Sequence, residues 1–121
     1  MIKTKRIYEQ LEEDGSLRIL IDRLWPRGVS KEKACIDHWF KELAPSHELR
    51  KWYQHDHAKW EEFQLRYYNE IDRSQPYLME LVELAKDRDI TLVFSSKETK
   101  KNNATALKKY LEALTEAGRK T

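Results

Sequence analysis

The sequence predicts a small α/β domain, in which a short and mostly buried sheet is flanked by several helices. Two continuous apolar runs, residues 19–21 and 90–94, are typical of strands covered on both faces. Elsewhere the apolar residues recur at helical spacing, which predicts helices that each bury one side. Strands followed by several helices, then a further strand and a last helix, indicate helices packed on one sheet.

Length and composition fit one domain over residues 1–121, because 121 residues leave no room for a second domain of ordinary size. Four Trp, six Tyr and three Phe supply large core side chains, and a formal net charge of +2 is close to balance. This composition is not that of a disordered chain. A pI near 8.6 is only mildly basic, so charge alone does not indicate nucleic-acid binding.

The sequence is typical of a cytoplasmic protein. Cys35 is the only cysteine, so no disulfide within the chain is expected. The basic N-terminal residues are not followed by an apolar run, and no stretch approaches the ~20 apolar residues of a membrane span. We therefore expect no signal peptide and no membrane partner. No pattern indicates a cofactor or an oligomeric state.

The first two strands are expected within residues 2–8 and 17–24. Only about eight residues separate them, whereas a parallel crossover usually needs a dozen or more. An antiparallel pair is therefore predicted. The second strand ends at Trp25-Pro26-Arg27-Gly28, because proline cannot donate to a sheet and glycine permits a positive φ.

Helices are expected through most of the remaining chain. Ser30 is a candidate cap for a short helix, and helical spacing then continues through Ile36, Trp39, Phe40 and Leu43. A break at residues 44–46 precedes four further expected features. The first is an apolar helix face at Leu49, Trp52 and Tyr53. The second is a helix that follows a cap at Asp56 and carries an apolar stripe at Trp60, Phe63, Tyr67 and Ile71. The others are a helix with Pro76 in its first position and a last helix that is capped by Asn102 or Asn103 and ends at Gly118.

Residues 22–28 carry the strongest indication of a binding site. Asp22, Arg23, Trp25 and Arg27 lie together at the exit of a buried strand. Arginine binds phosphate and carboxylate through paired hydrogen bonds, and open α/β sheets bind ligands at the carboxyl ends of their strands. The arginines would hold an anion, Asp22 would orient one of them or act as a base, and Trp25 would supply a stacking wall.

The strand at residues 90–94 also leads into a polar loop and a helix N-terminus, which favours anions. If the two apolar strands are parallel neighbours, their exit loops converge on one small anionic ligand. The predicted ligand-binding residues are Asp22, Arg23, Trp25, Arg27, Lys97 and Asn102, with Arg6, Arg18 and Arg50 as further candidates. The alternative is a structural turn, in which Asp22 pairs with an arginine and Trp25 covers the core.

The histidine, cysteine and serine residues give weaker indications of a metal site or a catalytic nucleophile. His55 and His57 would need a non-helical backbone to share a metal with His47, so no metal site is predicted. Cys35 lies beside the apolar Ile36, and we expect it to be a small core residue. Ser95 and Ser96 are possible nucleophiles by position alone, since no nucleophile or phosphate-loop motif is present.

Two other classes of function remain open. Lysine and arginine pairs at residues 100–101, 108–109 and 119–120 make the C-terminal region basic, as in a nucleic-acid-binding protein. The aromatic residues fall on helical stripes, however, which is typical of core packing. A protein-interaction module would instead be indicated if Trp39, Trp52 or Trp60 were exposed.

Residues 18–28, RILIDRLWPRG, resemble the signature of the YeaO-like bacterial proteins, a family of unknown function. The resemblance covers nearly the whole chain. It includes Ala44-Pro45-Ser46, Leu49-Arg50, His55-Asp56, Trp60, Phe63, Tyr67, Thr91-Leu92 and Asn102. It implies a bacterial cytosolic domain. Some members are labelled transcriptional regulators of the MarR type, but no winged helix can be placed after Gly28.

The chain departs from the family pattern at the start of the last helix. Members of the family often carry Asn-His-Ala there, whereas this chain reads Asn102-Asn103-Ala104. A base or metal ligand at that histidine position is therefore missing here. Asn102 is left as the matching polar group.

Overall fold

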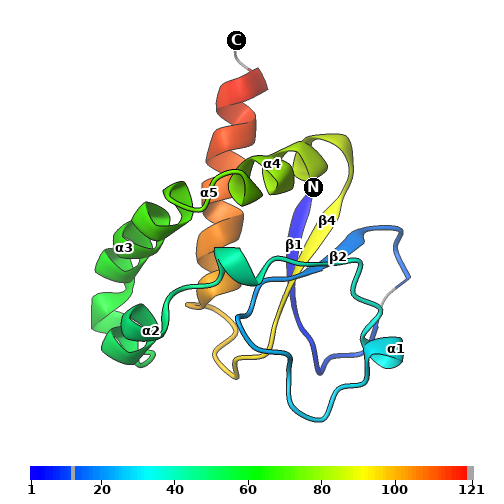
Figure 1. The fold of residues 1–121 in the computed structure, drawn as a ribbon, viewed down its shortest axis with the longest axis horizontal. Coiled ribbons are helices and arrows are strands. Elements are labelled where there is room, and N and C mark those ends of the chain that lie inside the picture. Colours follow the sequence, from blue (N-terminus) through cyan, green and yellow to red (C-terminus); the bar gives the residue numbers. More distant parts are fainter. Residues whose placement is uncertain (12, 120–121) are drawn as a thin grey trace.

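The computed structural model contains a four-stranded sheet and describes residues 1–11 and 13–119, the last three by their backbone alone. The strand order is β1-β4-β2-β3, and each neighbouring pair is parallel. Figure 1 shows the three longer strands running side by side toward one end of the molecule. The strands are β1 (Ile2–Arg6), β2 (Leu17–Leu20), β3 (His38–Trp39) and β4 (Ile90–Phe94).

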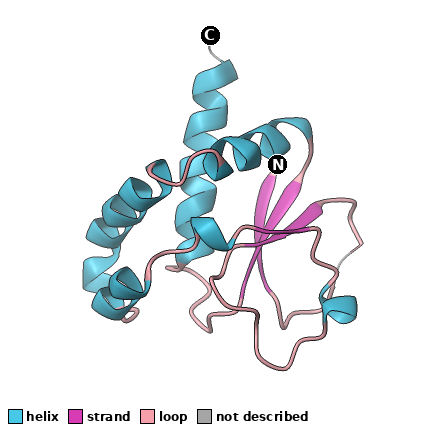
Figure 2. Ribbon diagram, in the orientation of Figure 1, coloured by secondary structure: helices cyan, strands magenta, loops and turns pink. Residues whose placement is uncertain are grey.

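Most of the helices lie on one side of the sheet, and α5 packs directly on β1 and β4. Figure 2 shows loops and one short helix on the other side. The α/β class predicted from the sequence is therefore confirmed. The helices are α1 (Lys31–Ala34), α2 (His47–Tyr53), α3 (Trp60–Asp72), α4 (Tyr77–Asp87) and α5 (Asn103–Arg119), with 3-10 turns η1 (Lys41–Leu43) and η2 (His57–Lys59).

The central strands are buried on both faces, as their continuous apolar runs predict. Ile19 and Leu20 are both fully buried although their side chains point to opposite faces. Ile19 belongs to the large core between the sheet and the helices. Leu20 and Val93 belong to a smaller cluster under α1 and the loops, which Ala34 completes.

The predicted antiparallel pairing of the first two strands is wrong. β4 lies between β1 and β2, and Ile90 is in register with both Ile2 and Leu17. The connection of about ten residues can reach roughly 33 Å when extended. To start β2 parallel to β1, the chain must travel back the length of a strand, roughly 17 Å, and across two strand positions, roughly 10 Å. An extended connection therefore replaces the usual crossover helix.

The predicted helix through residues 36–43 is also wrong. α1 ends at Ala34, because Cys35 adopts a left-handed backbone with φ of 51°. The following chain pairs with the outer edge of β2, where the amide of Phe40 donates to the carbonyl of Leu20 at 2.9 Å. This segment therefore forms the short strand β3 by hydrogen bonding to the carbonyls at the edge of β2, and a 3-10 turn follows it.

Two predicted caps, Ser30 and Asp56, are confirmed. The side chain of Ser30 accepts from the amide of Lys33. Ser46, at the predicted break, caps α2, where its side chain accepts from the amide of Leu49. Asp56 caps η2, which leads directly into α3. The described helices include none that is both long enough and apolar enough to cross a membrane.

The other two expected helix boundaries are shifted. Pro76 stands immediately before α4 instead of in its first position. α5 continues through Gly118 to Arg119. Such shifts of one residue are common at helix ends, which fray.

Candidate functional site

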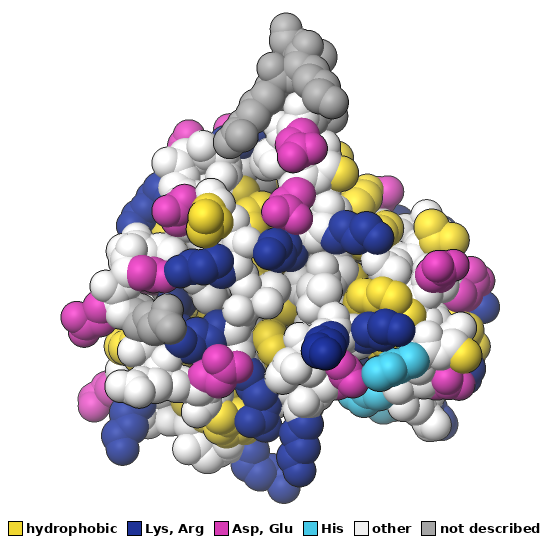
Figure 3. Space-filling model, turned by 180° about the vertical axis from the view of Figure 1, so that it is seen from behind, with side chains coloured by type: hydrophobic (Ala, Val, Ile, Leu, Met, Phe, Trp, Pro, Cys, Tyr) yellow, Lys and Arg dark blue, Asp and Glu magenta, His cyan; other side chains and the backbone are white. Residues whose placement is uncertain are grey.

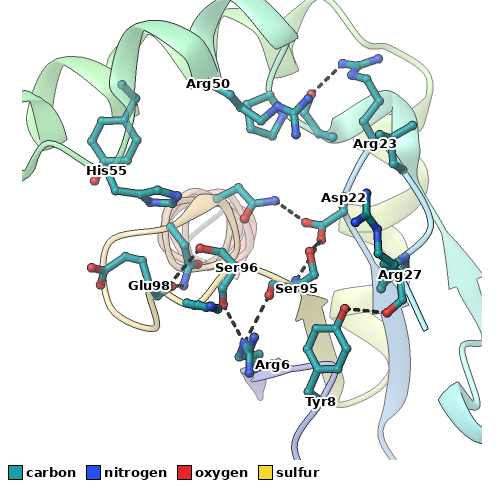
Figure 4. A pocket seen from close by; sticks show the side chains of 18 of the residues that line it. Arg6, Tyr8, Asp22, Arg23, Arg27, Arg50, His55, Ser95, Ser96 and Glu98 are labelled. Atoms are coloured by element: carbon teal, nitrogen blue, oxygen red, sulfur yellow. Dashed lines mark hydrogen bonds between the residues drawn. The ribbon is translucent and has the colours of Figure 1, made fainter. Parts of the chain in front are cut away.

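A cavity of about 880 Å³ lies at the carboxyl ends of β1, β2 and β4, beside the N-terminus of α5. It forms there because β2 and β4 are parallel neighbours, so their exit loops leave the sheet at the same edge. Figure 4 shows Arg50 and His55 approaching it from α2 and the turn that follows. Arg6 and Arg27 approach from the ends of β1 and the loop after β2.

All of the residues that the sequence predicts for the site line this cavity. They are Asp22, Arg23, Trp25, Arg27, Lys97 and Asn102. The turn that presents the first four requires Gly28, whose φ of 77° is left-handed. The cavity therefore brings together predicted residues as far apart in the chain as Asp22 and Asn102.

Asp22 holds the two strand exits together. Its Oδ2 accepts from the amide of Ser95 at 2.9 Å and from the Ser95 hydroxyl at 2.7 Å. Its Oδ1 accepts from the side-chain amide of Asn103 at 3.1 Å. No arginine of the described chain binds this carboxylate, so the expected pairing of Asp22 with an arginine is wrong. Asp22 links β2, β4 and α5 instead.

Asn102 supports the same loop from beneath. It is 2% exposed, donates to the carbonyl of Glu98 at 2.7 Å and accepts from the amide of Thr105 at 2.9 Å. The neighbouring Asn103 donates to Asp22 and to the carbonyl of Ile21. Asn102 caps α5, and Asn103 ties the helix to β2.

The predicted cationic residues differ in how far they are engaged. Arg23 donates to the carbonyl of Ala44 at 3.1 Å. Within the described chain, the Arg27 guanidinium and the Lys97 ammonium form no hydrogen bond and no ion pair, and both side chains are exposed. Trp25 is half-buried against the smaller core cluster, and its indole N–H donates to the carbonyl of Val29 at 2.7 Å.

Two of the further candidates also belong to the cavity. The Nε of Arg6 donates to the carbonyls of Ser95 and Ser96 at 3.2 and 3.0 Å. Arg50 is exposed on α2, and its guanidinium has no partner among the described residues. Arg18 does not line the cavity. It is 8% exposed and donates to the carbonyl of Ala34 at 2.9 Å, which makes it part of the packing of α1.

The cavity wall carries more positive than negative charge. Five lysine or arginine side chains line it, but only two carboxylates, Asp22 and Glu98. The amide of Lys100, the His57 side chain and the amide of Lys101 donate to Glu98 and lower its pKa to about 2. Figure 3 shows lysine and arginine gathered at the lower end, where the strands have their carboxyl ends in Figure 1.

Sequence reasoning missed several residues of the wall. Tyr53 is buried and donates to the carbonyl of Lys101 at 2.9 Å, and burial raises the pKa of its phenol to about 12. His55 follows it with a left-handed backbone, φ 56°. Helical spacing could not reveal either role, because α2 ends between them. A left-handed histidine has no local sequence signal.

The histidines do not converge on a metal. His55 lines the cavity, whereas the Nε2 of His57 lies 2.9 Å from Glu98 Oε2. No three His, Cys, Asp or Glu side chains in the described ranges are grouped to hold an ion.

The possible nucleophiles are engaged or distant. The Ser95 hydroxyl donates to Asp22, and the Ser96 hydroxyl accepts from the amide of Glu98. Cys35 is exposed instead of belonging to the core, and it does not line the cavity.

The tryptophans offer little free apolar surface. Trp39 is 37% exposed, whereas Trp52 and Trp60 are half-buried against the core. Arg66 also covers the Trp52 ring, at 4.0 Å from its centroid. Only Trp39 therefore meets the condition set for a protein-interaction surface.

Comparison with known proteins gives consistent matches over nearly the whole chain. The family described as "Inactive DUF488-N3 subclade" matches residues 1–120. The chain is 37% identical over 113 residues to the uncharacterized protein YeaO of Escherichia coli, covering 93% of this chain and 98% of that protein. It is 34% identical over 110 residues to the uncharacterized protein Rv3073c of Mycobacterium tuberculosis, covering 91% and 92%.

No solved protein structure matches the chain. The family match and the YeaO relative nevertheless both extend across the strand exits and helices that build the cavity. The chain therefore belongs to the YeaO-like proteins of the inactive DUF488-N3 subclade.

Proposed function

We propose that the cavity binds a small ligand carrying a phosphate or carboxylate group. The observation that carries this proposal is the state of three basic side chains, Arg27, Arg50 and Lys97. They line one cavity and have no partner in the described chain, while both carboxylates of the wall are hydrogen-bonded to protein donors. An anion is the partner that such groups lack.

The surrounding structure would hold these groups in place before a ligand arrives. Asp22 joins the loops after β2 and β4, and Arg6 bridges the carbonyls of Ser95 and Ser96. The N-terminus of α5 faces the same region, and its dipole favours negative charge. A preorganised site loses less entropy when it binds.

Binding without turnover fits the site better than catalysis. The hydroxyls of Ser95 and Ser96 both take part in hydrogen bonds of the loop. The Asn103 side chain is an amide, which cannot act as a general base, and it donates to Asp22 and to the carbonyl of Ile21. The family description itself names an inactive subclade.

Isothermal titration calorimetry with inorganic phosphate, pyrophosphate and citrate tests the proposal. We expect R27A and R50A each to weaken binding by about tenfold or more, since a hydrogen bond to a charged group contributes roughly 1.5–3 kcal/mol. R73A is the matched control, because Arg73 is also exposed and has no side-chain partner but does not line the cavity.

Three results would overturn the proposal. The first is the absence of heat with every anion, and the second is an equal loss of affinity in R73A. The third is tight binding of a short DNA that weakens steeply with salt and is unaffected by R27A, which would favour a nucleic-acid-binding protein with its surface elsewhere.

A further inference from the structure

The cavity is larger than a simple anion needs. Its volume of about 880 Å³ lies in the range of roughly 300–1,000 Å³ found for pockets that enclose drug-sized molecules. A bare phosphate would contact the cations and leave most of the wall in water. The remainder of the wall therefore indicates what else the ligand carries.

That remainder is rich in rings. Five aromatic or imidazole side chains line the cavity together with the basic groups, namely Tyr8, Trp25, Tyr53, His55 and Phe63. Two of them are already stacked on each other, since Tyr53 and Phe63 have ring centroids 4.3 Å apart. Rings and cations in one cavity are the combination that binds planar, phosphate-bearing molecules.

His55 is the ring most available to a ligand. It is exposed, and its nitrogens have no hydrogen-bond partner in the described chain. Its centroid lies 5.8 Å from that of Tyr53, at an interplanar angle of 58°. A ligand ring can therefore contact the imidazole without displacing an existing bond.

The backbone is held in an unfavourable conformation to place this ring. Gln54 and His55 have φ of 45° and 56°, a left-handed conformation that side chains rarely adopt twice in succession. The turn brings His55 to the cavity, and two residues later His57 leaves it for Glu98. Strain of this kind is concentrated at binding sites.

The charges favour a ligand with more than one negative charge. Arg27, Arg50 and Lys97 have no partner among the described residues, and five lysine or arginine side chains line the wall against two carboxylates. A phosphate monoester, which is close to a dianion near neutral pH, matches this excess better than a single carboxylate.

We propose that the ligand is a nucleotide, whose phosphate is bound by Arg27, Arg50 and Lys97 and whose base contacts His55. This inference rests on the proposed anion site and adds the ring. His55 is then the residue that distinguishes a nucleotide from a sugar phosphate.

The test compares AMP, GMP, CMP and UMP with ribose 5-phosphate and adenosine by isothermal titration calorimetry. At least one nucleotide should bind about tenfold or more tightly than ribose 5-phosphate, as expected for a stacked base. R27A should weaken both classes. H55N should remove the advantage of the nucleotide and leave ribose 5-phosphate unchanged.

Asparagine is chosen at position 55 because it tolerates the left-handed backbone, so the turn is retained without the ring. Circular dichroism and the urea midpoint verify that H55N is folded. H47A is the control, since His47 is exposed on α2 and does not line the cavity.

The outcomes separate the two proposals. Equal binding of ribose 5-phosphate and all four nucleotides would overturn the nucleotide inference and leave the anion site standing. A nucleotide advantage that survives in H55N would also overturn it. Failure of every phosphate compound to bind, or adenosine binding as tightly as AMP with no effect of R27A, would overturn the anion site itself.

Discussion

The carboxylate of Asp22 accepts two hydrogen bonds from Ser95, one from its backbone amide at 2.9 Å and one from its hydroxyl at 2.7 Å. These residues are 73 positions apart, at the exits of the adjacent strands β2 and β4. The pair sets the distance between the two loops that carry Arg27 and Lys97. Binding groups and structural groups are thus neighbours in this cavity, and substitutions can separate them.

Replacing Asp22 by asparagine should destabilise the fold. One carboxylate oxygen becomes an NH₂ group, so an acceptor is lost at Ser95 or at Asn103. We expect the free energy of unfolding, measured in urea, to fall by about 1–3 kcal/mol. D87N is the control, because Asp87 is exposed at the end of α4 and has no side-chain partner. Equal stability of D22N and D87N would contradict the role assigned to Asp22.

Alanine substitution should affect the free energy of unfolding very differently at Arg27 and at Arg18. R27A should change the unfolding free energy by no more than about 0.5 kcal/mol, because the guanidinium is exposed and unpartnered. R18A should lower it by about 1–3 kcal/mol, because Arg18 is 8% exposed and donates to Ala34. Comparable losses in both variants would mean that Arg27 is part of the packing and not a free binding group.

Tyr67 should make the protein sensitive to alkali. Its phenol is fully buried and donates to the carbonyl of Leu43 at 2.6 Å, and burial holds its pKa well above 10. Above about pH 10 the unfolded chain releases this proton while the folded chain retains it, so stability falls as pH rises. Urea titrations between pH 8 and about 11 should show this decline.

Y67F provides the matched comparison. It should be less stable by about 1–3 kcal/mol near neutral pH, since Leu43 loses its donor. Its decline in alkali should be shallower, because one raised phenol is gone. Y77F is the control, as Tyr77 is 39% exposed and has no hydrogen-bond partner in the described chain. A slope for Y67F as steep as that of the native protein would argue against a buried phenol.

Glu98 should titrate abnormally at acid pH. Donors from Lys100, His57 and Lys101 lower its pKa from the ordinary 4.5 to about 2. Its contribution to stability is therefore complete above about pH 4.5 and is lost as the pH falls toward 2. In H57A, carboxyl NMR titration should show a higher Glu98 pKa, whereas H47A should not change it. An unaltered Glu98 pKa in H57A would exclude the side-chain pair.

Local patterns were sufficient to predict much of this protein. The apolar runs at residues 19–21 and Ile90–Phe94 identified the buried strands, and the caps at Ser30 and Asp56 marked helix starts. The arginines of residues 22–28 marked a strand exit that does line a cavity. These features depend on side-chain size, spacing and hydrogen-bonding groups of near neighbours, which a single sequence displays directly.

Long-range pairing was not predictable in the same way. Whether β1 joins β2 or β4 depends on which strand edges meet in the folded chain, and a short connection was misleading. Trp39 follows a helical spacing in the sequence but lies in a strand, because its segment hydrogen-bonds to the edge of β2. The pairing of strands that are dozens of residues apart produces no periodic pattern in the sequence of either strand.

The residue pattern alone was enough to predict that buried strands end in loops rich in arginine, lysine and serine. Which of these groups are free depends on how the chain folds. Asp22 was a candidate base and instead accepts hydrogen bonds from Ser95 and Asn103, whereas Arg27 has no partner in the described chain. The physical reason is that a polar group is occupied or available according to its distance from others, and those distances are set by the parallel packing of β2 against β4.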